Sequence, residues 1–122
     1  LHFQIPDRAQ GKLVRVARGA ALDVAVDLRK GSPTFGQHQK ALLTEENRWQ
    51  FWLPEGFAHG FLTLEPDTVF CYKCTEVYSP EHERSLLWND ADLAIDWGTG
   101  SPLLSAKDEV APAFAAFQSP FD

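Results

Sequence analysis

Alternation of apolar and polar residues is the strongest pattern in the chain, and it predicts short β-strands. In the clearest case, residues 22–28, one face carries Leu22, Val24, Val26 and Leu28. The other face carries Asp23 and Asp27, because successive side chains of a strand point to opposite sides. Further strands are predicted at residues 12–17, 49–53, 59–64 and 68–78.

Glycine and proline recur along the chain and separate these segments, with turns expected at residues 54–57 and 65–67. Such regular spacing is typical of antiparallel sandwiches and barrels. Helical signals are confined to residues 105–108 and 112–117, and the tail from Ser119 is expected to fray. The pattern therefore predicts an all-β fold with short C-terminal helices.

Composition narrows the class of protein. The 122 residues correspond to one domain, and 44% hydrophobic with 23% charged residues is an ordinary globular balance. The net charge of -6 leaves no basic face of the kind that binds nucleic acid. No apolar run is long enough to cross a bilayer. We therefore expect residues 1–122 to form a single domain with neither nucleic acid nor membrane as a partner.

Two cysteines, Cys71 and Cys74, stand three positions apart, which raises the question of a redox or zinc pair. Residues three apart on a strand point to opposite faces, and one such pair without a second is a weak zinc signal. The spacing favours two reduced thiols in a cytoplasmic protein.

Polar residues occupy a strand face where apolar ones would be expected. The predicted strand at residues 68–78 puts Tyr72 and Tyr78 on one face, roughly 20 Å apart at about 3.3 Å per residue. Either one tyrosine lies deep in a ligand cavity and the other at its mouth, or both are wall residues with their hydroxyls in water.

The four histidines do not form a metal-binding pattern, because no two of them are spaced as H-x-H or H-x-x-x-H. They are His2, His38, His59 and His82. A lone histidine is most often a hydrogen-bonded structural residue, but it also serves as a general base near neutral pH.

A series of motifs in a fixed order carries a family resemblance. The motifs are Leu1-His2-Phe3-Gln4, Gly11-Lys12-Leu13-Val14-Arg15-Val16, Asp23-Val24-Ala25-Val26-Asp27-Leu28-Arg29, Ser32-Pro33-Thr34-Phe35-Gly36, Pro54-Glu55-Gly56-Phe57-Ala58-His59-Gly60-Phe61, Tyr78-Ser79-Pro80-Glu81-His82-Glu83 and Trp88-Asn89-Asp90. From Leu1 to about Asp108 the chain resembles the dTDP-4-dehydrorhamnose 3,5-epimerase family.

The resemblance implies a cupin-type barrel (a double-stranded β-helix or jelly roll) that forms a homodimer and uses no metal or other cofactor. It also implies epimerisation at C3 and C5 of dTDP-4-dehydro-6-deoxy-D-glucose, through an enolate, to dTDP-4-dehydro-L-rhamnose. A related enzyme that inverts only C3 or only C5 would share the same base and acid. A metal-dependent cupin oxygenase is disfavoured by the histidine spacing.

The same resemblance assigns roles to individual residues. His2 matches the catalytic base and Tyr72 the proton donor, while Asp108 resembles the acid that orients the base. Lys12 resembles the cation near the 4-keto oxygen. The resemblance further implies substrate contacts at Lys12, His59, Tyr78, Glu83 and Lys107. It adds Asp23 to this binding site as a group that supports those contacts from behind.

Members of the family usually carry Arg-Gly just before the Leu-His motif, after a substantial N-terminal segment. The resemblance implies that this chain lacks that segment, which supplies strands and nucleotide contacts. His2 would then lie beside a frayed end, and we expect residues 1–122 alone to be weakly stable, prone to associate and nearly inactive. A truncated, non-catalytic sugar-nucleotide binder is thus a second reading.

Overall fold

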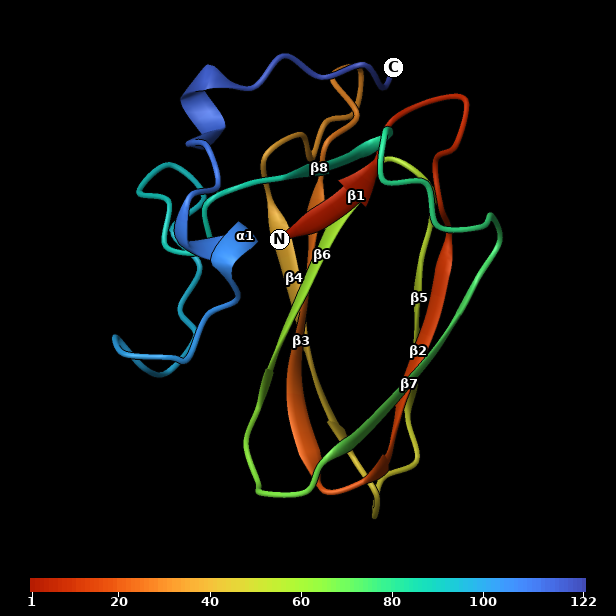
Figure 1. Ribbon diagram of the computed structural model, residues 1–122, viewed down its shortest axis with the longest axis vertical. Helices are drawn as coiled ribbons and strands as arrows, with labels where there is room; N and C mark the ends of the chain where they lie inside the picture. The colour runs from red at the N-terminus through yellow and green to blue at the C-terminus, as the bar shows by residue number, and fades with distance from the viewer.

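Two antiparallel sheets face each other in the computed structural model, which describes residues 1–122 (Figure 1). The five-stranded sheet has the order β4 (His38–Thr44), β3 (Ala20–Asp27), β6 (Phe57–Thr63), β1 (His2–Gln4) and β8 (Glu83–Ser85). The three-stranded sheet has the order β5 (Gln50–Leu53), β2 (Lys12–Arg18) and β7 (Val69–Cys74). The predicted all-β class is confirmed.

The faces of β3 explain how the two sheets are packed. Val24 and Val26 lie in an apolar cluster on the outer face of the five-stranded sheet. Ala21 and Ala25 belong to a second cluster that fills the space between the sheets. Asp23 shares the inner face with them, as the predicted alternation requires. The acidic face of this strand therefore points into the barrel and its most apolar face points out of it.

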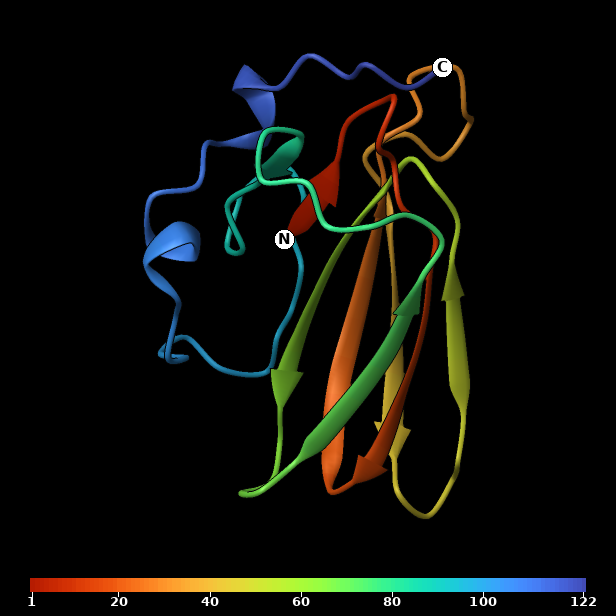
Figure 2. The same cartoon turned by 45° about the vertical axis from the view of Figure 1, so that its right-hand side comes forward.

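The C-terminal segment covers that outer apolar face. It contains α1 (Ala106–Glu109) and a 3-10 turn, η1 (Phe114–Ala116), which match the two predicted helical regions. Figures 1 and 2 both show this segment on the side of the five-stranded sheet away from the three-stranded sheet. Leu93, Ile95 and Trp97 are buried there against the sheet. Neither helix is long and apolar enough to span a membrane.

Fraying of the two chain ends was expected and is wrong. Phe121 is buried, and the Ser119 hydroxyl donates to the carbonyl oxygen of Leu28. At the other end Leu1 is 3% exposed, and His2 pairs with both β6 and β8. Both ends are apolar segments that complete the outer core, so burial outweighs the entropy gained by fraying.

The predicted strand at residues 68–78 is too long. β7 ends at Cys74, and residues 75–82 form a loop, so Tyr72 and Tyr78 do not share a strand. Gln4, a buried residue of β1, holds this loop. Its side-chain amide donates to the Val77 carbonyl (3.2 Å) and its Oε1 accepts from the Ser79 N–H (2.9 Å). The estimated separation of the two tyrosines along one strand therefore does not apply.

Three strands were not predicted. β1 and β8 have three residues each, too few for alternation to be recognised, and β8 is polar. β4 carries no clean alternation, since Ala41, Leu42 and Leu43 are consecutive. These strands are defined by their pairing with β3, β6 and each other rather than by their own sequences.

Candidate functional site

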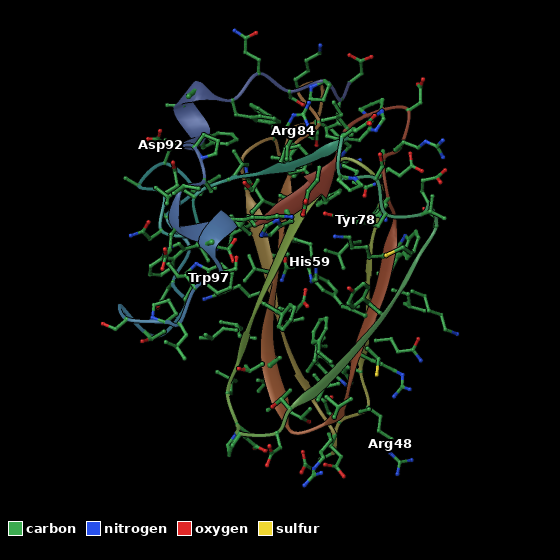
Figure 3. All side chains as sticks on the ribbon, in the orientation of Figure 1. Arg48, His59, Tyr78, Arg84, Asp92 and Trp97 are labelled. Atoms are coloured by element: carbon green, nitrogen blue, oxygen red, sulfur yellow. The ribbon has the colours of Figure 1, made fainter.

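The candidate residues converge on one end of the barrel from several elements. A cavity of about 330 Å³ lies there, lined among others by His2 (β1), Lys12 (β2), His59 (β6) and Asp108 (α1). Figure 3 shows His59 between the sheets near this end, whereas Arg48 lies at the opposite end of the barrel. No group of three or more His, Cys, Asp or Glu residues is arranged to hold a metal ion.

His2 pairs with Asp108 across 106 positions of sequence. Its Nε2 lies 2.7 Å from Asp108 Oδ1, and its Nδ1 lies 3.3 Å from Glu83 Oε1. Ser105 caps α1 and fixes the carboxylate, because its hydroxyl donates to Asp108 Oδ2 (2.9 Å) and accepts from the Asp108 N–H (3.2 Å). Burial alone would raise the pKa of Asp108, but hydrogen bonds, from Ser105 first, hold it below its usual value.

A second histidine–aspartate pair lies deeper. His59 Nε2 is 2.8 Å from Asp23 Oδ2, and both side chains are almost completely buried. The other oxygen of Asp23, Oδ1, is buried without a hydrogen-bond partner. Burial is the main reason that the pKa of Asp23 is raised, and the hydrogen bond to His59 opposes it. Phe61 and Phe70 stack against the His59 ring and shield it further.

Lys12 and Tyr72 come from the three-stranded sheet, opposite these pairs. Lys12 faces the space between the sheets, and burial lowers the pKa of its ammonium group. Tyr72 is opposite Val14, a residue of the inner cluster, so its side chain points to the same inner face. It remains 61% exposed. Tyr72 does not line the cavity that holds the other three catalytic candidates.

A hydrogen-bonded cluster flanks the cavity beside His2. Glu83 Oε2 accepts from Lys107 Nζ (2.7 Å) and from the Tyr78 hydroxyl (2.8 Å). Although burial alone would raise the pKa of Glu83, the hydrogen bonds from Lys107 and Tyr78 lower it. Tyr78 and Lys107 are mostly exposed, at 59% and 61%, so a ligand can reach both.

Comparison with known proteins identifies the fold and the family. The sequence matches the profile of the dTDP-4-dehydrorhamnose 3,5-epimerase family over residues 1–116. The chain is 55% identical over 116 residues to dTDP-4-dehydrorhamnose 3,5-epimerase of Pseudomonas aeruginosa, covering 94% of this chain and 64% of that protein. This chain belongs to the dTDP-4-dehydrorhamnose 3,5-epimerase family. It spans slightly less than two thirds of the length of the curated relatives it matches.

Solved structures agree with this family and with its cupin-type jelly roll. One is dTDP-6-deoxy-D-glucose-3,5-epimerase from Legionella pneumophila in complex with dTDP-4-keto-L-rhamnose. It is 47% identical with a TM-score of 0.93, and the match covers 100% of this chain and 66% of that one. Another is ChmJ, a 3'-monoepimerase from Streptomyces bikiniensis in complex with dTDP-quinovose. It is 39% identical with a TM-score of 0.88, and the match covers 93% and 58%.

Seven of the nine candidate residues of this epimerase-family chain form three hydrogen-bonded sets. His2 and Asp108 form one, His59 and Asp23 the second, and Tyr78, Glu83 and Lys107 the third. Lys12 and Tyr72 have no side-chain hydrogen bond to any of them. Residues that the sequence did not single out for the site are two tryptophans, part of the 98–105 loop and two supporting polar groups: Trp88, Trp97, Pro102, Leu103, Leu104, Gln4 and Ser105.

The missed residues carry different signals. Ser105 precedes Asp108 by three positions, which is the spacing of a helix cap, so the sequence does contain a signal for this contact. Gln4 and Trp97 carry no local signal, because their contacts lie 75 and 9 positions away respectively. Figure 3 places Trp97 in the segment outside the five-stranded sheet.

Proposed function

We propose that this chain is the catalytic part of an enzyme that epimerises C3 and C5 of dTDP-4-dehydro-6-deoxy-D-glucose, giving dTDP-4-dehydro-L-rhamnose. The observation that carries the proposal is the His2–Asp108 pair at 2.7 Å, on the wall of a cavity shared with Lys12 and His59. The proposal treats residues 1–122 as one epimerase domain.

The chemistry requires these residue types. A proton next to a ketone is weakly acidic, so removal by His2 needs stabilisation of the developing enolate oxygen. Lys12 and His59 are the groups proposed for that role. Asp108 fixes the orientation of the His2 ring and stabilises its charged form, as a carboxylate does in other histidine-based sites.

Inversion also needs a proton delivered to the opposite face of the sugar. Tyr72 is proposed as this acid, because a phenol donates a proton without carrying charge at neutral pH. It belongs to the sheet opposite His2, which supports attack on two different faces of a sugar held between the sheets. Each positioned acid or base contributes about 10²- to 10⁴-fold to the rate.

The substrate contacts are proposed at the third set. Tyr78 offers an aromatic face to the thymine, and Lys107 offers a cation to the diphosphate, with Glu83 between them. Asp23 supports His59 from behind. The ligands of the structural relatives, dTDP-4-keto-L-rhamnose and dTDP-quinovose, support a dTDP-sugar as the substrate class.

Deuterium incorporation from D₂O tests this function directly. The full-length protein is incubated with the 4-keto sugar in D₂O, and the labelled carbons are located by NMR. Deuterium at both C3 and C5 is the expected result. Deuterium at one carbon indicates a mono-epimerase, an activity that the likeness to ChmJ makes the second candidate. No deuterium would contradict both and indicate a non-catalytic binder.

The remaining parts of the proposal concern the assembly and its setting. We propose a homodimer that works without a metal in the cytoplasm. Epimerisation should therefore persist after treatment with a chelator, and the purified protein should contain no stoichiometric transition metal. One tightly bound equivalent, with activity lost on its removal, would contradict this part alone.

A further inference from the structure

Tyr78, the proposed thymine contact, lies in a stretch of chain that is not held by its own backbone. Residues 76–78 follow the end of β7 and make no backbone–backbone hydrogen bond. A loop without such bonds is normally mobile, because little opposes its conformational entropy. Side chains from elsewhere must therefore hold Tyr78 if its ring is to meet a ligand in one orientation.

The side-chain amide of Gln4 holds the backbone on both sides of Tyr78. Its Nε2 donates to the Val77 carbonyl oxygen (3.2 Å), and its Oε1 accepts from the Ser79 N–H (2.9 Å). The same Nε2 donates to the Arg8 carbonyl oxygen (2.6 Å). Gln4 is 3% exposed, so these bonds form largely away from water, where they are stronger.

Gln4 and Glu83 are directly opposite each other on β1 and β8, and together they hold Tyr78 at two points. Gln4 binds the backbone on either side of it, and Glu83 accepts a hydrogen bond from its hydroxyl (2.8 Å). The Tyr78 side chain is still 59% exposed, so a nucleotide base can stack on its ring. A ring oriented in advance loses less entropy when a ligand binds.

Strand β1 also carries the proposed base. His2 and Gln4 are two positions apart in this strand, so their side chains leave the same face, roughly 7 Å apart along it. One short strand therefore sets the distance between the group that removes the proton and the residue that holds the nucleotide contact.

We propose that Gln4 is a positioning residue that orients Tyr78 for the thymine ring before the substrate binds. The inference rests on the proposed function, because it takes a dTDP-sugar as the ligand and Tyr78 as its contact. Its consequence is that the nucleotide is held at a set distance from His2, which places the sugar carbon beside the base.

The test measures binding of dTDP to the full-length protein by calorimetry. Gln4→Met keeps the length of the side chain but removes its hydrogen-bonding groups, and it should raise the Kd about 10-fold, which corresponds to about 1.4 kcal/mol. Gln10→Met is the matched control, because Gln10 holds the same loop at the Glu76 carbonyl oxygen (2.7 Å) and not beside Tyr78. It should bind dTDP nearly as the wild type does. Equal losses in both variants would indicate general loosening of the loop and would overturn the inference.

A double variant shows whether Gln4 acts through Tyr78. Tyr78→Ala should weaken dTDP binding by itself, and adding Gln4→Met should then weaken it little further, because no ring is left to orient. The inference is overturned if the Gln4→Met loss is undiminished without Tyr78, or if Gln4→Met binds dTDP normally. If Tyr78→Ala binds dTDP as the wild type does, the nucleotide contact in the proposed function is wrong and the inference fails with it.

The wild-type protein supplies a second measurement in case Gln4→Met does not fold. In the absence of ligand the Ser79 N–H should exchange slowly with solvent, because Gln4 Oε1 already accepts from it. Saturating dTDP should slow this exchange little further. Fast exchange of the Ser79 N–H in the free protein, followed by strong protection on binding, would show that the ligand and not Gln4 orders the loop.

Discussion

Two histidine–aspartate pairs of nearly equal length lie in very different surroundings. The His59–Asp23 pair joins adjacent strands of one sheet, and its side chains are 9% and 0% exposed. The His2–Asp108 pair joins a three-residue strand to a four-residue helix, and its side chains are 29% and 25% exposed. The buried pair has aromatic neighbours, whereas the open pair has Glu83 and Ser105, which are polar.

The difference teaches that the surroundings of each pair, and not its residue types, determine which role the pair can take in the proposed reaction. A base that removes a proton from a substrate must reach it and must change its hydrogen-bond partners during the reaction. In the proposed function, the more exposed pair is the one suited to this role. A buried pair held by two strands is better suited to present a fixed charge or dipole to a developing oxyanion. It should matter more for stability, and the open pair more for rate.

The largest expected effect is on the rate, through the open pair. His2→Ala should lower deuterium incorporation by at least about 10²- to 10⁴-fold, the usual contribution of a positioned base. The fold should be retained, because the His2 side chain is partly exposed. His38→Ala, on β4 outside the site, is the control and should exchange normally. Full exchange in His2→Ala would show that another group is the base.

The next effect separates removal of the proton from the sugar carbon from the return of a proton to the opposite face of that carbon. Tyr72→Phe should keep part of the exchange at the sugar carbon while losing the inverted product, since His2 still removes the proton and no acid returns it from the other face. Exchange is measured by mass spectrometry and inversion by NMR of the product. If Tyr72→Phe epimerises as fast as wild type, Tyr72 is not the acid.

A smaller effect concerns stability, for which the buried pair should matter more than the open pair. Asp23→Ala leaves the buried His59 without a partner, which should cost about 1–3 kcal/mol in the free energy of unfolding. Asp108→Ala removes a partly exposed partner and should cost about 0–1 kcal/mol. Urea denaturation of both variants gives the comparison, and equal losses would contradict the assignment of roles.

The two aspartates should also give opposite pH dependences. The pKa of Asp23 is raised by burial, so the native state holds this proton to higher pH than the unfolded chain does. Wild type should therefore lose stability relative to Asp23→Asn as pH rises above about 4. The pKa of Asp108 is lowered, so wild type should lose stability relative to Asp108→Asn as pH falls below about 4. Slopes of the same sign would contradict this comparison.

The smallest effect is expected at the cysteines, which test the two faces of β7. Both thiols are free, with Cys74 opposite Lys12 on the inner face and Cys71 opposite Arg15 on the outer face. Replacing both with serine should leave catalysis nearly unchanged and stability modestly lower. Alkylation with a bulky maleimide should inhibit the Cys71→Ser protein, whose only thiol is Cys74, and spare the Cys74→Ser protein. The reverse result would contradict the assignment of faces.

The sequence by itself determined the features that depend on local order. Alternation in residues 22–28 placed Asp23 and Val24 on opposite faces, and a short helix was predicted to open in residues 105–108, where α1 begins. Cys71 and Cys74 were predicted to face opposite ways, and they do. These predictions succeed because side-chain direction in a strand and capping of a helix follow from backbone geometry over a few residues.

Only the tertiary structure decided which residues meet. No local signal links His2 to Asp108, and β1 and β8 are strands because neighbouring strands satisfy their backbone hydrogen bonds. The loop at residues 75–82 departs from its β-like pattern because Gln4 holds it, and the apolar tail stays packed because Phe121 fills the outer core. Long-range pairing minimises exposed apolar surface and unpaired polar groups over the whole chain, so a local segment cannot encode it.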